Sequence, residues 1–464
     1  MAKTTYSVRF WAIKTYKGTR VTTHTVRWIV DGREWKEPFR TLAHAESFRA
    51  QLMTAARQGE AFSVATGRPV SWQREETTLT WFTFTLSYVE AKWRYAAPNH
   101  RRGIAEALTD ATEALLTKHD GGPDTDTQRA ALRWAYSERL RGATEPPAEL
   151  AAALRWLEAN TVSMTAFEEP GKGALLTRGM LDRISQTRDG KTAAANTSNR
   201  KRMSLNNAME YAVEIGALAA NPLKAVKWTK PRTLTSVDPR VVVDPRVVIN
   251  VEQVRRFLAA VERRGERGRR MKAFFACMYF AALRPEEVVD LRQEHLVSLP
   301  ESGWGEMRLT HAEPRAGSRW TDSGKVRERR ALKHRPDGET RSVPIHPELC
   351  AMLRAHIQEF GTGPDDRIFL GPRGGLMTDR AYLKVFHEAR ADAFTTAEAK
   401  SPLMVVPYDL RHACVSTWLN AGVPAPQVAE WAGHSVNVLL RVYAKCIHGQ
   451  QSEAMRRIWD ATKS

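Results

Sequence analysis

The chain has 464 residues, of which 42% are hydrophobic and 26% charged, a composition typical of a globular protein too long for one compact core. Lysine and arginine number 70 against 52 acidic residues, and this net charge of +18 favours a polyanionic partner such as nucleic acid over a merely basic, well-solvated surface. The sequence has no apolar run long enough to span a membrane, and its polar start does not resemble a targeting peptide. Its four cysteines are scattered and form no CxxC pair, which argues against a disulfide framework and a structural zinc site. We therefore expect an intracellular, cytoplasmic protein of two or three domains.

Residues 6–40 alternate between polar and apolar side chains, as strands do, in the segments TYSVRFWAI, RVTTHTVRWIV and EWKEPF. The pair Asp31-Gly32 predicts a tight turn after the second segment. A helix is expected at 42–57, where apolar residues recur at helical spacing. The pattern predicts a small β-β-β-α module at residues 1–72.

From about residue 77 the pattern becomes helical, with breakers such as HDGGPD and EPP between the segments. The expected helices are 79–95, 99–117, 128–141, 147–159, 176–187 and 195–217. The last of them carries a basic cluster at Arg200–Arg202, which suits a DNA clamp, although a solvated helix face explains such charges about as often. We interpret residues 75–229 as one all-helical domain.

Residues 230–250 contain the near-duplication DPRVVVDPRVVI, in which Pro239 and Pro245 oppose a continuous helix. The duplicate is too short to be a structural repeat, so it predicts an extended linker between two domains. Asn250 is suited to cap the helix that follows.

Residues 251–464 carry helices, then strands, then helices again, which predicts a mixed α/β domain. The expected helices are 251–263, 270–283, 285–293, 346–359, 379–393, 409–421, 425–432 and 436–446. Strands are expected in EMRLTHAE, in the basic segment KVRERRALKHRPDGETRSVPI and in IFLGP. The whole chain is thus predicted to be multidomain and mainly α, with small β-sheets.

The segment ALRPEEVVDLR places an arginine at a helix junction. Pro285 suits the first position of a helix, so Arg284 is expected to project from the junction of two helices. Glu286 and Glu287 fall in the first turn, where acidic side chains favour the helix dipole.

A second arginine lies in the segment YDLRH. Asp409 is expected to cap a helix that ends before Gly422, which places Arg411 in the first turn with His412 beside it. A cation in the first turn opposes the helix dipole, which favours a non-structural reason for Arg411 more than at an ordinary helix position.

The segment AEWAGHSVNVLLRVYAK contains a break inside a helical pattern. Gly433 ends one helix and Ser435 can cap the next, so His434 is presented from a turn and Tyr443 from the second helix. Tyr443 lies on the apolar side of that helix, and taken alone this position predicts a packed core tyrosine.

Together these motifs resemble those of the tyrosine recombinase (phage integrase) family. The family's GLRxxE is matched by ALRPEE, its HxLRH by YDLRH, and its LGHxxxxxxxxY by AGHSVNVLLRVY, with the same spacing from histidine to tyrosine. Lys333 precedes RSVPI much as the family's hairpin lysine precedes its RxVP strand. The resemblance covers residues 250 to 450 strongly, extends more loosely to the helical region as a core-binding, SAM-like domain, and extends by layout only to the first module as an arm-type DNA-binding module.

By this resemblance, Tyr443 is the nucleophile that attacks a DNA phosphodiester, leaving a 3′-phosphotyrosyl bond and a free 5′-hydroxyl. Arg284 and Arg411 would hold the non-bridging phosphate oxygens. Lys333 would protonate the departing 5′-oxygen, and His434 would donate a further hydrogen bond to the phosphate. The resemblance implies no metal, no ATP and no other cofactor.

The sequence departs from the family at Tyr408, where the motif has a histidine that is commonly given a general-base role. A phenol is a poor base near neutral pH because its pKa is about 10, so either Tyr408 orients and bonds the phosphate or another group takes the proton. His412 either contributes to the chemistry of the site or only packs as its neighbour in the helix. In the hairpin, Lys325 is an alternative to Lys333 for the role of the hairpin lysine, and Lys333 is favoured by its place relative to RSVPI. Glu287 is a further residue expected to support the site.

The resemblance implies a site-specific DNA recombinase, an integrase that cleaves and exchanges strands at attachment sites and so integrates or excises a mobile element. It would act as a homo-tetramer on double-stranded DNA, with an accessory DNA-bending or directionality factor as a further partner. The resemblance implies no association with a membrane. The alternatives are a type IB topoisomerase-like enzyme that relaxes DNA, and a non-catalytic DNA-binding regulator in which Tyr443 is only a core residue.

Two further expectations concern the end of the chain and its source. Met455, Ile458 and Trp459 recur at helical spacing in the last segment, which suits docking onto a neighbouring subunit or onto their own domain. The Ala- and Arg-rich composition suggests a GC-rich genome, such as that of an actinobacterium, its phage or an integrative element.

Overall fold

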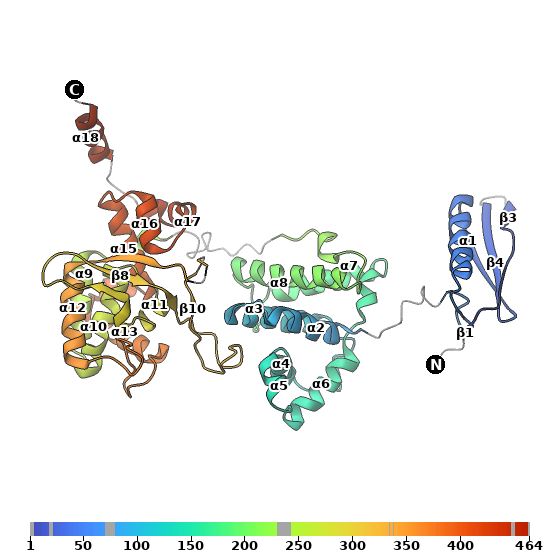
Figure 1. The fold of residues 1–464 in the computed structure, drawn as a ribbon, viewed down its shortest axis with the longest axis horizontal. Coiled ribbons are helices and arrows are strands. Elements are labelled where there is room, and N and C mark those ends of the chain that lie inside the picture. Colours follow the sequence, from blue (N-terminus) through green and yellow to red (C-terminus); the bar gives the residue numbers. More distant parts are fainter. Residues whose placement is uncertain are drawn as a thin grey trace. The chain divides into compact units, whose positions relative to one another are not determined.

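The computed structural model describes residues 4–17, 22–69, 79–229, 243–333, 335–336, 338–446 and 451–462. The chain is mainly helical with small sheets, as predicted (Figure 1). It divides into two compact units, Met1–Thr83 and Phe84–Ser464, and each is described by itself.

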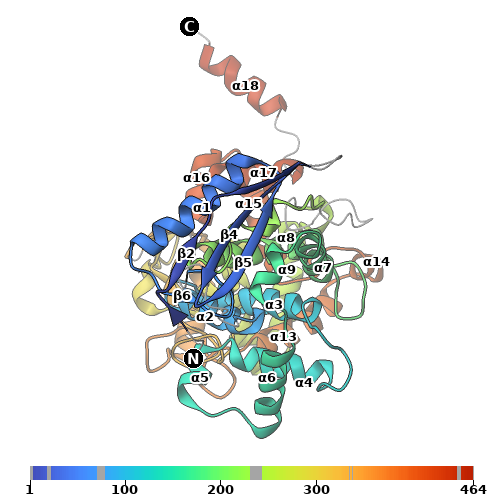
Figure 2. The same cartoon turned by 90° about the vertical axis from the view of Figure 1, so that its right-hand side faces the viewer.

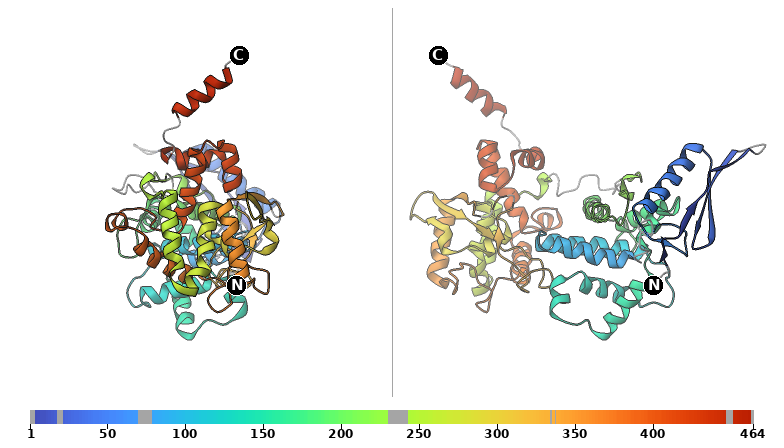
Figure 3. Two further views of the ribbon diagram at one scale, coloured as in Figure 1. Left: turned by 90° about the vertical axis from the view of Figure 1, so that its left-hand side faces the viewer. Right: turned by 45° about the vertical axis from the view of Figure 1, so that its right-hand side comes forward.

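The first unit is a sheet with one helix packed on it (Figures 2 and 3). Its elements are β1 (Thr4–Thr5), β2 (Val8–Phe10), β3 (Lys14–Lys17), β4 (Thr22–Val30), β5 (Arg33–Phe39), α1 (Leu42–Arg57) and β6 (Phe62–Ser63). Strands β2 and β3 pair with β4, which also pairs with β5 across a turn formed by Asp31 and Gly32, whose φ angles are 51° and 79°. Leu52 of α1 packs on Val26 and Trp28 of β4, which fixes the helix to one face. The bounds of α1 are those predicted, whereas β3 was not predicted.

A helical region follows, which lies in the second unit except for the first three residues of α2. Its elements are α2 (Trp81–Trp93), α3 (Pro98–Ala114), α4 (Thr125–Ala135), α5 (Glu138–Ala143), α6 (Ala148–Asn160), the 3-10 turn η2 (Met164–Glu168), α7 (Lys172–Ile184) and α8 (Ala195–Glu214). The single helix predicted at 128–141 is wrong, because it is two helices. The side chain of Ser137 accepts a hydrogen bond from the Leu140 amide and caps a new helix, α5.

Buried ion pairs hold several of these helices together. Asp110 of α3 bonds both Arg129 of α4 and Lys201 of α8, while Glu113 bonds Arg129 and Arg183 of α7. Lys201 belongs to the basic cluster predicted for a DNA clamp. Lys201 instead forms an ion pair with Asp110 inside the helical region. The arginines on either side of it, Arg200 and Arg202, do not take part in this ion pair.

The region that carries the motifs singled out in the sequence begins with helices. Its elements are the 3-10 turn η4 (Pro245–Val247), α9 (Val251–Glu262), α10 (Gly265–Phe280), α11 (Pro285–Val289), η5 (Gln293–His295), β7 (Leu296–Ser298), β8 (Gly305–Leu309), β9 (His311–Ala312), β10 (Arg330–Ala331), β11 (Arg341–Ile345), α12 (Pro347–Phe360), α13 (Asp379–Ala393), α14 (Thr396–Lys400), α15 (Tyr408–Asn420), α16 (Ala425–Ala432), α17 (Val436–Tyr443), η6 (Ala444–Cys446) and α18 (Gln451–Thr462). Strands β11, β8 and β7 form an antiparallel sheet in that order, and β9 pairs with β10. The strand predicted at IFLGP is wrong: of these residues, Leu370 makes only an isolated bridge to Leu376.

Two hydrophobic clusters build this region. The larger contains Phe257 of α9, Phe274 of α10 and Phe386 of α13, and the smaller lies among α15, α16 and α17 and includes Leu439 and Tyr443. The helices of the smaller cluster gather at one side of the larger one in Figure 1 and in the left view of Figure 3.

The described end of the predicted linker is fastened to α17. The Val243 amide donates to the Val442 carbonyl over 2.8 Å, and the Cys446 thiol donates to the Val243 carbonyl. Asn250 caps α9 as predicted, in a capping box with Gln253. The first copy of the near-duplication, with Pro239, lies outside the described residues.

The final helix α18 leaves Met455, Ile458 and Trp459 exposed. Among the helices in the described part of the chain, none is both long and apolar enough to cross a membrane.

Candidate active site

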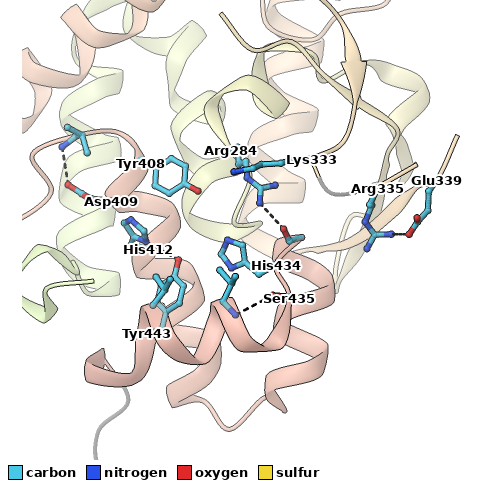
Figure 4. A pocket seen from close by; sticks show the side chains of 14 residues that line it. Arg284, Lys333, Arg335, Glu339, Tyr408, Asp409, His412, His434, Ser435 and Tyr443 are labelled. Carbon is cyan, nitrogen blue, oxygen red and sulfur yellow. Dashed lines mark hydrogen bonds and ion pairs between the residues drawn. The ribbon is translucent and has the colours of Figure 1, made fainter. Parts of the chain in front are cut away.

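A cavity of about 1060 Å³ brings together most of the residues that the motifs single out (Figure 4). Its lining includes Arg284, Lys333, Tyr408, His412, His434 and Tyr443. Arg411 and Glu287 are buried and contact these residues, as described below. Residues that lie more than a hundred positions apart in the sequence therefore face one space.

Arg284 is held at the junction of α10 and α11. Pro285 takes the first helical position, as predicted, and the Arg284 main chain is extended there. The guanidinium donates to Glu287 Oε1 over 2.7 Å and to the Gly433 carbonyl over 2.8 Å, and the Arg284 amide donates to Glu287 Oε2. One carboxylate thus fixes both the backbone and the side chain of Arg284.

Glu287 also binds a second arginine, which the sequence analysis did not select. Arg341, the first residue of β11, is fully buried and donates to both carboxylate oxygens of Glu287, over 2.9 and 2.7 Å. Burial alone would raise the pKa of the Glu287 carboxyl, but Arg341 and Arg284 outweigh it and hold that pKa far below its usual range. Glu287 is therefore a carboxylate at any physiological pH.

Arg411 of α15 is the third buried arginine, with 0% of its surface exposed. It donates to the main-chain carbonyls of Ala282 and Ala432, and to Nε2 of His434 over 2.9 Å. Arg411 thus bridges the α10–α11 junction and the turn between α16 and α17.

The buried charges of the site do not balance. Three guanidinium groups, of Arg284, Arg341 and Arg411, surround the carboxylate of Glu287, which binds only two of them directly. Burial, and then repulsion by Arg411, Arg284 and Arg341, lowers the pKa of His434 to about 2. A cluster of this kind selects an anionic ligand, since a negative group at its surface relieves the mutual repulsion of the cations.

Gly433 shapes this cluster from the backbone. It ends α16 in the left-handed conformation, with φ 64° and ψ 48°, and Ser435 caps α17 by accepting from the Val438 amide, as predicted. A β-carbon at Gly433 would lie 2.4 Å from Nη1 of Arg341 and 3.3 Å from Nη1 of Arg284. Only glycine lets the turn approach the guanidinium groups so closely.

Replacing Gly433 with alanine is expected to destabilise the protein more than left-handed strain alone, which costs about 1–2 kcal/mol. The added methyl group must displace Arg341 or Arg284 from the shared carboxylate. Gly216→Ala is the matched control, because its φ is +73° and nothing lies within 4 Å of the added carbon. Urea unfolding of both variants measures the difference, and equal losses would contradict the expectation.

Tyr443 is both a core residue and a residue of the site. Its ring is fully buried in the smaller hydrophobic cluster beside Leu439, so the prediction of a packed core tyrosine is confirmed. Its hydroxyl lies 2.9 Å from Nδ1 of His412, the two side chains meeting at the cavity wall (Figure 4). Burial raises the pKa of the Tyr443 phenol, although Arg411 acts in the opposite direction.

Tyr408 is the first residue of α15 and lines the same cavity. Its ring meets the His412 ring edge-on, with centroids 5.0 Å apart, and the Arg411 guanidinium lies 5.8 Å from its centroid. The predicted cap at Asp409 is wrong, because the helix begins one residue earlier. The Asp409 carboxylate instead accepts from the Val406 amide and fixes the loop before α15.

The two candidate lysines are separated by their positions. Lys333 lines the cavity next to Arg284 (Figure 4). Lys325 does not line it; its carbonyl accepts from Thr321 and its amide donates to Ser323, within a loop that precedes β10.

The free protein is expected to lose stability as the pH falls below about 6.5, the usual histidine pKa. Burial, and then Arg411, lowers the pKa of His412 to about 4, so the unfolded chain binds this proton at a pH where the folded chain does not. Since the unfolded state holds more protons, His412 lowers stability by up to about 1.4 kcal/mol per pH unit between those values. Urea unfolding at several pH values should show a shallower slope for His412→Asn, whereas His387→Asn, at an exposed position of α13, should keep the native slope.

The geometry suits nucleophilic attack on an anionic ester. A phenol that can attack, an imidazole in contact with it, buried guanidinium groups that can bind an anion, and the amine of Lys333 beside Arg284 are all present around one cavity. Arg341 was missed because its segment RSVPI was used only to place Lys333. A buried arginine cannot be distinguished from an exposed strand arginine by sequence spacing alone.

Comparison with known proteins matches residues 248–447 to the model of the phage integrase family. A comparison with curated protein sequences returns no match.

Several solved structures are similar in part. The Tn1549 transposon integrase in complex with transposon right end DNA has 18% sequence identity, covering 72% of this chain and 99% of that chain, with a TM-score of 0.45. The XerH recombinase bound to palindromic difH substrate, in a post-cleavage complex, has 14% identity over 79% of this chain and 98% of that chain, with a TM-score of 0.41. The catalytic domain of bacteriophage HP1 integrase has 17% identity over 46% of this chain and 94% of that chain, with a TM-score of 0.28.

Proposed function

Residues 248–447 form a domain of the phage integrase family, and from this premise we propose that the protein is a site-specific DNA recombinase that works through a 3′-phosphotyrosyl intermediate. The observation that carries the proposal is the buried charge excess of Arg284, Arg341 and Arg411 beside the Tyr443 hydroxyl. A phosphodiester supplies the missing negative charge and also the atom that a phenol attacks.

The roles follow from the chemistry of the transfer. Tyr443 Oη forms a bond to phosphorus while the bond to the 5′-oxygen breaks, and the leaving oxygen takes a proton from Lys333. Arg284 and Arg411 hold the non-bridging oxygens, because guanidinium groups match phosphate geometry and stay charged as negative charge builds. His434 donates a further hydrogen bond to the phosphate, and Tyr408 orients it, since a phenol is a poor base.

Glu287 and Arg341 support these groups. Glu287 holds Arg284 in place, and Arg341 holds Glu287, so neither needs to touch the DNA. Because the phosphotyrosyl bond conserves the energy of the broken ester, the reaction needs no ATP.

The other parts of the chain take DNA-binding roles in this proposal. The sheet module at 1–72 binds arm-type sites, residues 75–229 form the core-binding domain, and 230–250 link it to the catalytic domain at 251–464. Four copies act together on paired attachment sites in the cytoplasm of a bacterial host, with α18 docking between copies through its exposed Met455, Ile458 and Trp459. The outcome is the integration or excision of a mobile element.

The test is covalent capture. The full chain is incubated, with EDTA and without ATP, with nicked duplexes whose core is randomised and whose short strand diffuses away after cleavage. Recovery of a protein–DNA adduct, followed by sequencing of the attached strands, is expected to yield one site family. Absence of any adduct would refute the proposal, and relaxation of supercoiled DNA without strand exchange would favour a topoisomerase-like activity.

Lys333→Ala is expected to slow cleavage of the captured site by about 10²- to 10⁴-fold, the usual contribution of a general acid. A sulfur atom in place of the 5′-bridging oxygen should restore much of the rate, because a thiolate leaves without a proton. Single-turnover adduct formation measures both effects. The matched control is Lys325→Ala, which should cleave at the native rate; a slow Lys325→Ala with a native Lys333→Ala would reverse the assignment.

A further inference from the structure

One contact of the nucleophile is not used by the roles given above. The Tyr443 hydroxyl lies 2.9 Å from Nδ1 of His412, a residue of α15 that follows Arg411 directly. This distance is that of a hydrogen bond, and it joins the attacking oxygen to a nitrogen that can take its proton.

The neighbouring groups are less suited to this task. The ring of Tyr408 has no basic nitrogen. The ring of His434 is 6.1 Å from that of Tyr443, centroid to centroid, and its Nε2 accepts a hydrogen bond from Arg411. His412 is the imidazole whose Nδ1 lies within hydrogen-bond distance of the phenol oxygen.

We propose that His412 is the general base of the cleavage step, accepting the Tyr443 proton at Nδ1. This inference rests on the proposed function. It assigns to His412 the general-base role that the family motif gives to a histidine at the position of Tyr408.

The surroundings of His412 support a neutral imidazole before cleavage. Burial and the adjacent Arg411 keep its pKa low, at about 4, so its ring is unprotonated at neutral pH. The groups that face the His412–Tyr443 pair are Tyr408 and Arg411 from α15 and His434 from the turn before α17. A phosphate bound to the arginines adds negative charge nearby, which offsets the repulsion by Arg411 and strengthens the base when DNA is present.

The protons balance over the whole exchange. In cleavage, the Tyr443 proton moves to His412, the bond between Tyr443 Oη and phosphorus forms, the bond to the 5′-oxygen breaks, and Lys333 protonates that oxygen. In rejoining, a 5′-hydroxyl gives its proton to Lys333 and its oxygen bonds to phosphorus, the bond between phosphorus and Tyr443 Oη breaks, and the imidazolium of His412 returns its proton to the leaving tyrosine oxygen.

The Tyr408 ring has a positioning role in this arrangement. Its edge-on contact with the His412 ring, 5.0 Å between centroids, fixes the plane of the imidazole.

The deciding variant is His412→Asn, whose amide occupies the place of Nδ1 and can bond the phenol but cannot take its proton. Cleavage of the site recovered by covalent capture is expected to slow by about 10²-fold or more, while DNA binding is retained. Incorporating difluorotyrosine at position 443, whose phenol ionises more readily, should restore much of the lost rate. His387→Asn, the same change at an exposed histidine, should leave cleavage unchanged.

Two results would overturn the inference. One is a His412→Asn variant that cleaves within about threefold of the native rate, because a general base contributes far more than that. The other is a slow variant that difluorotyrosine does not improve, which would mean that His412 only packs. His412→Gln replaces His412→Asn if the latter fails to bind DNA. The proposed function fails separately, by the lack of any native adduct.

Discussion

Tyr443→Phe is expected to abolish covalent attachment to DNA while leaving DNA binding intact. The variant loses only the hydroxyl oxygen, which is the attacking atom in the proposed mechanism, and the rate should fall by a factor on the order of 10⁴ or more. The ring remains packed beside Leu439, and the lost hydrogen bond to His412 costs only about 0.5–1.5 kcal/mol. A denaturing gel measures the adduct on the captured site, and a mobility shift measures binding.

Tyr382→Phe is the matched control for this experiment. Tyr382 of α13 is also a buried tyrosine, and its hydroxyl donates to Asp379 over 3.2 Å. Removing the Tyr382 hydroxyl breaks a similar hydrogen bond but removes no atom that reacts in the proposed mechanism, so cleavage should continue. An adduct formed by Tyr443→Phe would mean that another residue is the nucleophile.

Glu287→Gln is expected to be the most destabilising single change in the site, by about 3–5 kcal/mol, as when one partner of a buried ion pair is removed. Glu287 is 2% exposed and binds Arg284 and Arg341, so its neutralisation leaves three buried cations without a counter-charge. Sulfate or phosphate should stabilise this variant more than the native protein, because an anion that binds only the folded state shifts unfolding by mass action. Urea unfolding with and without sulfate measures both effects.

Glu286→Gln provides the comparison. Glu286 is adjacent and carries the same charge in the same helical turn, but it is only half-buried. It should lose far less stability and gain less from sulfate. Equal losses in the two variants would show that the arginine cluster does not depend on one carboxylate.

Much of the fold could be predicted from local signals. The turn at Asp31-Gly32 and the bounds of α1, α13 and α16 follow from turn residues, caps and helical spacing, because each of these depends only on neighbouring residues. Strand β3 was missed because all four of its residues are exposed, so no apolar alternation marks it. The apolar run IFLGP predicts a strand, but its residues do not pair with another strand beyond one isolated bridge. An apolar run shows that a segment is buried, and it does not show that a neighbouring strand is present to pair with it.

The candidate site could be predicted only in part. Family-like motifs selected the residues that line the cavity, and helix chemistry placed Arg284 and the break at Gly433. The bridge from Glu287 to Arg341 and the contact of Tyr443 with His412 join distant segments, and no local rule reveals such a partnership. The place of Lys333 before RSVPI favours it over Lys325 in the sequence, and the structure shows that Lys333 lines the cavity whereas Lys325 does not.

The hydrogen bond from the Val243 amide to the Val442 carbonyl fixes the described end of the connector next to Tyr443. Val442 directly precedes Tyr443 in the chain, and the thiol of Cys446, three residues after Tyr443, donates to the Val243 carbonyl. Val243 therefore holds the backbone on both sides of Tyr443 through its main-chain amide and carbonyl alone. Any side chain at position 243 other than proline would keep both hydrogen bonds, so this restraint on Tyr443 depends on the path of the backbone and not on the residue type.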